Sequence, residues 1–409
     1  MYLTFAWRYF KAKKSANAIN VIAWVTTGVI AFATMCQVLV MSVFNGFEDL
    51  VKSLYASFYT DIRISAAKGK TITLSPAQLA QINAQPGIAA SSLIAEEKAL
   101  LHNKDGDQQT VVLLKGVDST YHRVAGVAEK TNRGSFDIGT ADEPGLVVGA
   151  GIQNAVGISV DAALPSSHLT LIMPNKASSG LGNPLEAISE GNVDAKGVFT
   201  IQQDFDSKYA ITHIDFVKLH TGMQSNEYTA VEILLRPDAD ANAAATALRQ
   251  LLGSAYTVQT KYEQNPTLYS TMRLEKWAIF AVLTLILIIA AFNMLSALTM
   301  LVLEKQKDIA VLQSMGATKG MIQKIFLSEG LLLGAIGAGI GILMALLVCW
   351  LQVKYKLIKL AGGSFLIDYF PVKLVLSDLL LVAATALFIA LMAAWLPSKK
   401  AAGQAFGLR

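Results

Sequence analysis

The clearest pattern along the chain is a set of four long stretches without a charged side chain. The first lies between Lys14 and Glu48, and the others are Trp277–Leu303, Gly330–Leu351 and Leu379–Leu396, with 27, 22 and 18 residues. As an α-helix even the shortest spans about 27 Å, close to the ~30 Å hydrocarbon core of a bilayer. A charge at the centre of an inserted helix costs about 2.5–3.5 kcal/mol, and buried helices of soluble proteins rarely lack a polar face over such lengths. The pattern therefore predicts four transmembrane helices.

The flanks of these stretches predict their orientation. The first stretch is too long for a signal peptide and no cleavage site with small residues follows it, so we expect an uncleaved anchor. The N-terminal segment, the loop between the second and third stretches, and the tail hold 11 Lys and Arg, against four between the third and fourth. Because Lys and Arg stay on the cytoplasmic side, both termini are expected in the cytoplasm.

The region between the first two stretches has a different composition from the rest. From Phe47 to Ser270 there are 17 Lys and Arg against 24 Asp and Glu, a net charge of −7, whereas the remainder carries +11. The whole chain is 53% apolar and only 16% charged, which excludes an ordinary cytosolic enzyme, a disordered protein and a nucleic-acid binder. An acidic soluble domain and a basic, apolar membrane frame are therefore expected in one chain.

The acidic region is predicted to be a mixed α+β domain. Ser75-Pro76 is typical of a helix start, and Lys104-Asp105-Gly106 of a hairpin turn between two apolar runs, Leu93–Leu101 and Gln109–Lys115. The segment Ala125–Pro144 is rich in Gly, Thr and Asp, so two lobes are plausible. Further strands are expected at Asp61–Ser65, Leu169–Met173, Val198–Gln202, Ala230–Leu235 and Tyr256–Lys261, with a helix at Ala241–Leu252 that ends at Gly253.

The expected organisation has nine segments. They are a cytoplasmic N-terminal segment (1–18), transmembrane helix 1 (19–46), an extracytoplasmic α+β domain (47–270), transmembrane helix 2 (271–303), a cytoplasmic segment (304–325), transmembrane helix 3 (326–352), a short outer loop (353–377), transmembrane helix 4 (378–396) and a cytoplasmic tail (397–409).

Catalytic chemistry is not visible in the sequence. No phosphate-binding loop, nucleophile elbow or zinc-binding helix motif occurs, so this chain is not expected to be an enzyme or to bind ATP, another cofactor or a metal itself. Cys36 and Cys349 both lie within predicted spans, so the outer domain is not expected to need a disulfide. The histidines lack metal-ligand spacing: His102, His122, His168, His213 and His220.

Three regions carry information about function. In Leu303–Ile325 a charged start precedes apolar residues at helical spacing, which fits either a helix on the membrane surface or a helix that docks into a cytoplasmic partner. Val38–Leu54 continues an apolar face beyond the bilayer, for core packing or for accepting lipid. The third stretch contains two Gly-x-x-x-Gly pairs, which favour close helix packing: Gly330, Gly334, Gly337 and Gly341.

Several of these segments resemble the LolC/LolE family, the membrane subunits of the lipoprotein-releasing ABC transporter. The resemblance rests on FAWRYFKAKKSANAIN and MSVFNGFEDLVKSL around the first span, PGLVVGAGIQNAVGISV in the outer domain, AAFNMLSALTMLVLEKQKDIAVLQSMGAT, and SFLIDYFPVKL. These motifs occur in the family's order over most of the chain. Broader relatives are the MacB-like macrolide-exporter permeases and the FtsX-like cell-division proteins, which share the four-span plan.

The resemblance implies a permease of the inner membrane that extracts lipoproteins and hands them to a periplasmic chaperone. Two permease chains would pair, and two copies of a separate ABC ATPase, which binds ATP and Mg²⁺, would dock on the cytoplasmic side. Residues expected to line a cavity for lipoprotein acyl chains are Met35, Val38, Leu39, Met41, Ser42, Phe44, Phe47, Asn293 and Ser296. Residues expected to couple to the ATPase are Glu304, Lys305, Lys307, Asp308, Leu312, Met315 and Gly316.

The resemblance also implies a chaperone-binding loop at Pro174–Pro184, with Asn175, Leu181 and Gly182. The end of the chain, LPSKKAAGQAFGLR, departs from the family's usual ending, which puts the docking of the tail in doubt. Features of both subunit types are present, so a homodimer and a heterodimer both stay open. Two alternatives also stay open: an FtsX-like regulator of cell-wall hydrolases and a MacB-like efflux permease.

Overall fold

The computed structural model describes residues 17–160, 168–175, 187–360 and 369–403. The chain forms two compact units, which are treated separately below. The first contains Met1–Leu50 and Ser270–Arg409, and the second is Val51–Tyr269. Two helices cross the boundary between them along the chain, α2 (Asn17–Phe58) on the way in and α10 (Pro266–Glu304) on the way out.

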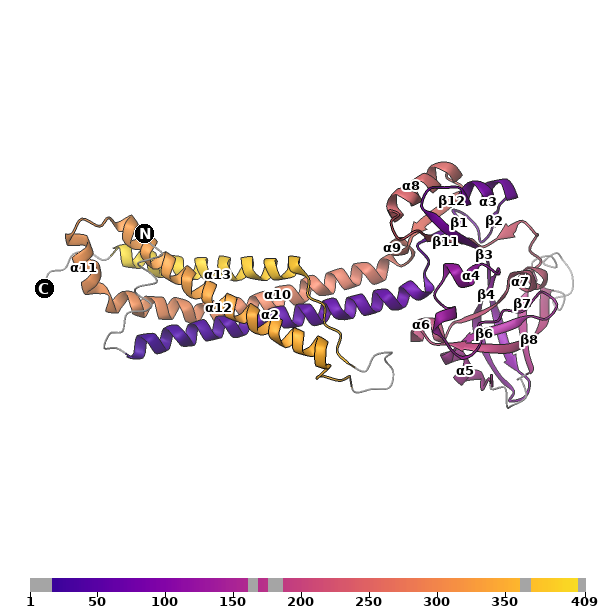
Figure 1. The fold of residues 1–409 in the computed structure, drawn as a ribbon, viewed down its shortest axis with the longest axis horizontal. Coiled ribbons are helices and arrows are strands. Elements are labelled where there is room, and N and C mark those ends of the chain that lie inside the picture. The colour runs from indigo at the N-terminus through magenta and orange to yellow at the C-terminus, as the bar shows by residue number, and fades with distance from the viewer. Residues whose placement is uncertain (1–16, 161–167, 176–186, 361–368, 404–409) are drawn as a thin grey trace. The chain divides into compact units, whose positions relative to one another are not determined.

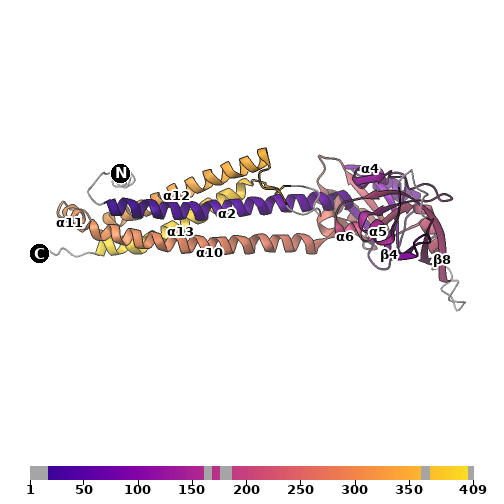
Figure 2. The same ribbon diagram turned by 90° about the horizontal axis from the view of Figure 1, so that it is seen from below.

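The first unit is a bundle of long helices that lie side by side (Figures 1 and 2). After α2 and α10 the chain forms the short helix α11 (Gln306–Ser314), then α12 (Lys319–Tyr355) and α13 (Leu376–Gly403). Within the described residues, four helices are long and apolar enough to cross a membrane: α2 from Val21, α10, α12 and α13. This agrees with the four stretches found in the sequence.

Local sequence explains where these helices run and end. Asn45-Gly46 does not interrupt α2, which continues to Phe58 as the apolar periodicity predicts. Thr318 caps α12, where its side chain accepts a hydrogen bond from the Met321 amide. Gly316 has φ +94°, a left-handed conformation that suits glycine at the turn between α11 and α12.

The helices pack around small residues. One cluster joins Ile30 of α2, Met294 and Leu298 of α10, Leu333 of α12, and Ala390 and Ala394 of α13. About two turns further along α2, Val38 packs with Ala345 of α12 and Val382 of α13. All four long helices therefore share one core within this unit.

The second unit is built on a ten-stranded sheet with the strand order β12-β1-β11-β3-β4-β9-β6-β8-β5, in which β7 pairs with β3 and β8. A separate pair is formed by β2 and β10. The strands are β1 (Ile62–Ala66), β2 (Ile72–Thr73), β3 (Ile88–Asn103), β4 (Gln108–Val117), β5 (Thr131–Gly134), β6 (Gly145–Gly149), β7 (His168–Pro174), β8 (Ile188–Phe199), β9 (Tyr209–His213), β10 (Glu227–Tyr228), β11 (Ala230–Leu235) and β12 (Tyr256–Thr260). The helices are α3 (Pro76–Asn83), α4 (Tyr121–Val124), α5 (Ala150–Val156), α6 (Gln203–Asp206), α7 (Ile214–Thr221), α8 (Ala241–Leu252) and α9 (Lys261–Gln264), with a 3₁₀ turn, η1 (Ala128–Lys130).

Most elements expected from the sequence are present. Ser75 forms a capping box with Gln78 at the start of α3, and Gly253 follows α8. The hairpin of β3 and β4 is antiparallel over ten residue pairs. The strand expected at Val198–Gln202 is wrong in its bounds, because β8 ends at Phe199 and the chain then turns into α6.

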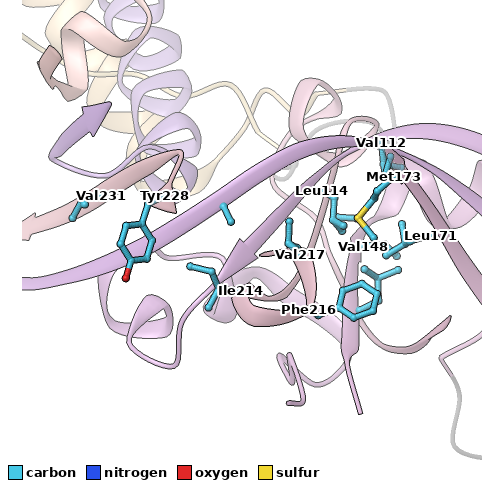
Figure 3. Packing of buried hydrophobic residues seen from close by; sticks show 14 of the residues in the cluster. Val112, Leu114, Val148, Leu171, Met173, Ile214, Phe216, Val217, Tyr228 and Val231 are labelled. Atoms are coloured by element: carbon cyan, nitrogen blue, oxygen red, sulfur yellow. The ribbon is translucent and has the colours of Figure 1, made fainter. Parts of the chain in front are cut away.

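Two apolar cores support this sheet. The larger one brings together β-strand residues such as Leu114 and Val148 with Phe216 and Val217 of α7 (Figure 3). The second contains Tyr55 and Phe58 of α2. The last turns of α2 are thus part of the second unit's own core. The segment Ala125–Pro144, where two lobes were expected to meet, contributes β5 to the edge of the same sheet.

Candidate functional site

The expected lining of the acyl-chain cavity divides between two faces of the helix bundle. Val38, Met41 and Ser42 of α2 are buried, whereas Asn293 and Ser296 lie on the exposed face of α10. The other expected lining residues are partly exposed: Met35, Leu39, Phe44 and Phe47. The structure therefore does not bring all of these side chains to one surface of a single chain.

The buried part of this set faces the bundle's own interior. Val38, Met41 and Ser42 surround a cavity of about 10 Å³ together with Asp378 and Val382 of α13. A space of this size holds at most one water molecule. This side of α2 consequently has no room for an acyl chain, and a carboxylate introduced at Val38 or Met41 would disturb the bundle.

The exposed face of α10 offers a larger apolar surface. Ile289, Phe292, Met300 and Leu303 are all exposed and recur at helical spacing on either side of Asn293 and Ser296. Apolar side chains in such a stripe need lipid, substrate or another helix as their partner. Phe292, 64% exposed, was not singled out from the sequence, although the same spacing marks it.

Near the end of α10 this face is hollowed. An open groove of about 610 Å³ is lined by Leu295, Ser296, Thr299, Met300, Leu303 and Glu304 of α10 and by Lys400 of α13. Its wall is apolar and its charged residues are Glu304 and Lys400. The groove can therefore hold apolar chains whose polar ends reach a charged rim.

The segment expected to couple to an ATPase forms α11. Ile309 anchors it in a cluster with Val302, Ile322 and Phe326. On the opposite side Met315 is 79% and Val311 57% exposed. The helix thus presents two unpartnered apolar side chains among the described residues, as a docking helix does.

The charged residues of this segment lie at the start of α11 and just before it. Lys305 Nζ lies 3.0 Å from Asp308 Oδ2, one turn apart at the start of α11. Leu312 is partly exposed, and the remaining expected coupling residues are exposed: Glu304, Lys307 and Gly316. Val311 was not predicted, because it does not share the helical spacing of Ile309, Leu312 and Met315.

The four glycines of the two Gly-x-x-x-Gly pairs in α12 lie against neighbouring helices. A Cβ built on Gly330 would lie 2.3 Å from the Ala394 Cβ, and one on Gly334 would lie 2.3 Å from the Ala390 Cβ, both in α13. Gly337 and Gly341 contact the backbone of α2, with Gly341 facing the carbonyl oxygen of Ala31. The four glycines therefore serve two helix contacts, one with α13 and one with α2.

The expected chaperone-binding loop starts from a paired hairpin. Pro174 ends β7, and the amide of Asn175 donates to the carbonyl oxygen of Ala187 at 2.8 Å. Leu181, Gly182 and Pro184 lie outside the described residues. Near the start of strand β8, Ser189 Oγ lies 2.7 Å from Nδ1 of His220, and burial lowers the pKa of that imidazole.

Next to the last turn of α2, four charged side chains lie on adjacent strands of the sheet. They come from the neighbouring strands β1, β11, β3 and β4 as Arg63, Glu232, Glu96 and Lys115. Arg63 pairs with Glu96 at 2.6 Å and with Glu232 at 2.9 Å. The ammonium of Lys115 lies 4.7 Å from the ring centroid of Phe58, the last residue of α2. This charge ladder, as we name the four residues, was not predicted from the sequence.

The residues that follow α2 also contact the residues that precede α10. Lys261 Nζ lies 2.9 Å from Asp61 Oδ1, and the Gln264 side chain donates to the carbonyl oxygen of Thr60 at 2.9 Å. These contacts lie wholly within the second unit. A displacement of one connection must therefore move the other.

Comparison with known proteins finds proteins similar to this chain along nearly its whole length. Residues 280–406 match the family model described as FtsX-like permease C-terminal. The lipoprotein-releasing system transmembrane protein LolC of Neisseria meningitidis serogroup B is 27% identical over 405 residues, which are 96% of this chain and 95% of that protein. The corresponding LolE of Haemophilus influenzae is 25% identical over 413 residues, 97% of this chain and 96% of that protein.

Among solved structures, the periplasmic region of MacB from Actinobacillus actinomycetemcomitans aligns with 53% of this chain and 94% of its own length, at 14% identity and a TM-score of 0.35. The similarity to proteins named LolC and LolE extends over 96–97% of this chain, in agreement with the resemblance drawn from the motifs.

Proposed function

We propose that this LolC/LolE-like chain is the permease subunit of an ATP-driven transporter that extracts lipoproteins from the outer leaflet of the inner membrane. The observation that carries the proposal is its similarity over nearly its full length to proteins named as lipoprotein-releasing system components. The four candidate spans, with the α+β unit inserted between the first and second, support the same plan.

In this proposal the four helices span the inner membrane, both termini are cytoplasmic and the second unit lies in the periplasm. The excess of Lys and Arg in the three segments named above supports that orientation. A second permease chain, of the same or the related type, completes the assembly.

The main obstacle to extracting a lipoprotein is the burial of its acyl chains in the membrane. Each buried CH₂ of an acyl chain contributes about 0.8 kcal/mol, so several long chains hold a lipoprotein in the membrane very firmly. The exposed apolar face of α10, with Phe292, Asn293 and Ser296, supplies a surface on which such chains can leave bulk lipid. We expect this face and the partly exposed side of α2 to border the cavity between paired chains.

Energy enters from a separate ABC ATPase present in two copies, which binds ATP and Mg²⁺. Its docking surface is α11, whose exposed Val311 and Met315 are held by the buried anchor Ile309. Because Ile309 packs on α10, α12 and α13, a push on α11 reaches the helices of the bundle.

Delivery requires a periplasmic chaperone that accepts the acyl chains. The segment Pro174–Pro184, which joins the antiparallel strands β7 and β8, is the expected contact. The antiparallel pairing of the described strands on either side of this segment supports the proposal.

The test is a mild-detergent purification of the tagged chain from cells, followed by mass spectrometry of bound proteins and lipids. Recovery of an ABC ATPase together with triacylated lipoproteins is the expected result, and a second permease chain would identify the dimer type. An ATPase accompanied by a wall-hydrolase regulator, or by a periplasmic efflux adaptor and no lipoprotein, would reject the proposal in favour of an FtsX-like or MacB-like function.

A further inference from the structure

One carboxylate joins three helices of the bundle. Asp378, in the first turn of α13, accepts a hydrogen bond from Asn45 Nδ2 of α2 at 2.7 Å and an ion pair from Lys276 Nζ of α10 at 2.9 Å. Both donors meet the same oxygen, Oδ2. Asn45 and Lys276 lie in the parts of α2 and α10 that are nearest along the chain to the second unit.

These groups are shielded from solvent. The Asp378 side chain is 13% exposed, Lys276 is 28% exposed and Asn45 is buried. A carboxylate removed from water is costly unless its charge and hydrogen bonds are satisfied. Loss of either donor should therefore destabilise the contacts of Asp378, whereas the loss of a partner in an exposed ion pair costs little.

The segment before α13 reinforces this connection on α2. The Lys373 amide donates to the carbonyl oxygen of Ser42 at 3.0 Å, and its ammonium pairs with Asp49. Gly46 packs directly on the backbone of Pro371, where a Cβ would lie 2.3 Å from the carbonyl oxygen. Phe370 meets Phe47 edge to face at 5.8 Å between ring centroids.

We propose that Asp378 is a positioning residue that holds the ends of α2, α10 and α13 together throughout the transport cycle. The helices α2 and α10, which continue into the second unit, then move as one body with α13. A movement of the bundle is therefore passed to the second unit and does not make these helices slide past one another. Acyl chains accordingly pass along the outside of this three-helix joint and not between α2 and α10 of the same chain. The inference rests on the proposed transport function.

The first test is substitution in the complete complex, with lipoprotein release and ATP hydrolysis measured on the same sample. Asp378→Asn is expected to keep ATP hydrolysis and to lower the lipoprotein released per ATP by roughly fivefold or more, the lower range of coupling between sites. The exchange pair Asn45→Asp with Asp378→Asn restores the carboxylate–amide contact and is expected to recover release. An unchanged release per ATP in Asp378→Asn, or no recovery in the exchange pair, would overturn the inference.

The second test distinguishes a permanent joint from one that opens. Asn45→Cys and Asp378→Cys, in a chain with Cys36→Ser and Cys349→Ala, are linked with a short bis-methanethiosulfonate reagent that reductant removes. Because the unlinked variant lacks the Asp378 carboxylate, its release per ATP is expected to be lowered as in Asp378→Asn, and the link is expected to restore it, with each single cysteine variant as control. If the link stops release while ATP hydrolysis continues, or if no link forms, the inference is wrong. Failure of the unsubstituted complex to release lipoprotein would reject the proposed function instead.

Discussion

The ammonium nitrogen of Lys115 lies 2.8 Å from Oε1 of Glu232, and the two side chains are 0% and 3% exposed. Burial alone would lower the pKa of Lys115, but the nearby Glu232, followed by Tyr121 and Glu96, more than offsets this, so the pKa is raised and the lysine stays charged. The aromatic rings of Phe58 and Tyr121 cover it at 4.7 and 4.9 Å. The last residue of α2, Phe58, therefore packs on the buried ammonium group of Lys115, which is held in place by Glu232 of β11.

Removing that cation should loosen the second unit. Lys115→Met leaves Glu232 buried with only Arg63 as an ion-pair partner, so we expect a loss of about 3 kcal/mol in local stability. The check is hydrogen exchange of the β4 and β11 amides in the full chain in detergent.

Two further variants control this measurement. Lys70→Met, which removes an ion pair whose lysine is 76% exposed, should change protection by well under about 1 kcal/mol. Lys115→Met combined with Glu232→Met should recover part of the loss, because Arg63 keeps Glu96 at 2.6 Å. Equal effects of Lys70→Met and Lys115→Met would contradict this account.

The charge ladder also predicts sensitivity to acid. Burial would raise the pKa of Glu96, but Arg63 and Lys115 outweigh it and hold the pKa below the ordinary 4.5. A carboxyl with a depressed pKa in the folded state adds stability that is complete above its unfolded pKa and is lost as pH falls through the folded value. Protection of β3 and β4, corrected for intrinsic exchange, should thus stay level above pH 4.5 and fall below it.

Glu96→Gln supplies the comparison for this pH profile. The variant has no carboxyl to titrate, so its profile should be flatter below pH 4.5 than that of the unsubstituted chain. Identical profiles would show that other carboxyl groups dominate the acid response.

The membrane frame could be predicted because its signals are local. Long uncharged stretches predict the spans, and the continuing periodicity of Phe47, Leu50, Val51 and Leu54 predicts that α2 passes Asn45-Gly46. Capping chemistry at Ser75 likewise predicts the start of α3. Each of these signals needs only residues within a few turns of one another.

The joint and the charge ladder could not be predicted in the same way. Asn45 and Asp378 are 333 positions apart, and Lys115 and Glu232 are 117 apart. Nothing near these residues in the sequence distinguishes them from solvated polar side chains. Burial of Val38 and Met41 against α13 likewise depends on which face of α2 the bundle covers, and an apolar helix with little periodic contrast does not reveal that face.

Two glycines of the same helix offer a matched test of packing. Gly334→Val places a side chain where a Cβ is already 2.3 Å from the Ala390 Cβ, and overpacking costs about 1–3 kcal/mol. Gly339→Val meets no atom within 4 Å of its Cβ among the described residues. Thermal unfolding of the purified full chain should show a clear loss for the first variant and little change for the second. A similar loss in both would indicate that the propensity of α12, and not its contact with α13, sets the stability.

The exposed side of α11 can be tested apart from its buried anchor. Val311→Asp and Met315→Asp should reduce recovery of the ATPase with the tagged chain at least roughly tenfold, while thermal unfolding of the chain alone stays unchanged. Charge is then introduced on a surface that the bundle does not use. Exposed Val40 of α2 provides the control position, where Val40→Ala should not affect ATPase recovery. Normal recovery in both α11 variants would place the docking surface elsewhere.

Deletion of Ala177–Asn183 addresses the chaperone contact. The flanking residues Pro174 and Ile188 are paired partners of β7 and β8, so a shortened connection between the two strands should leave their ladder intact. Capture of the periplasmic chaperone by the tagged complex should be abolished, and recovery of the ATPase should be unaffected because its proposed docking surface, α11, belongs to the other unit. Hydrogen exchange of β7 and β8 serves to verify that the ladder survives. Undiminished chaperone capture with an intact ladder would assign the contact to another surface of the second unit.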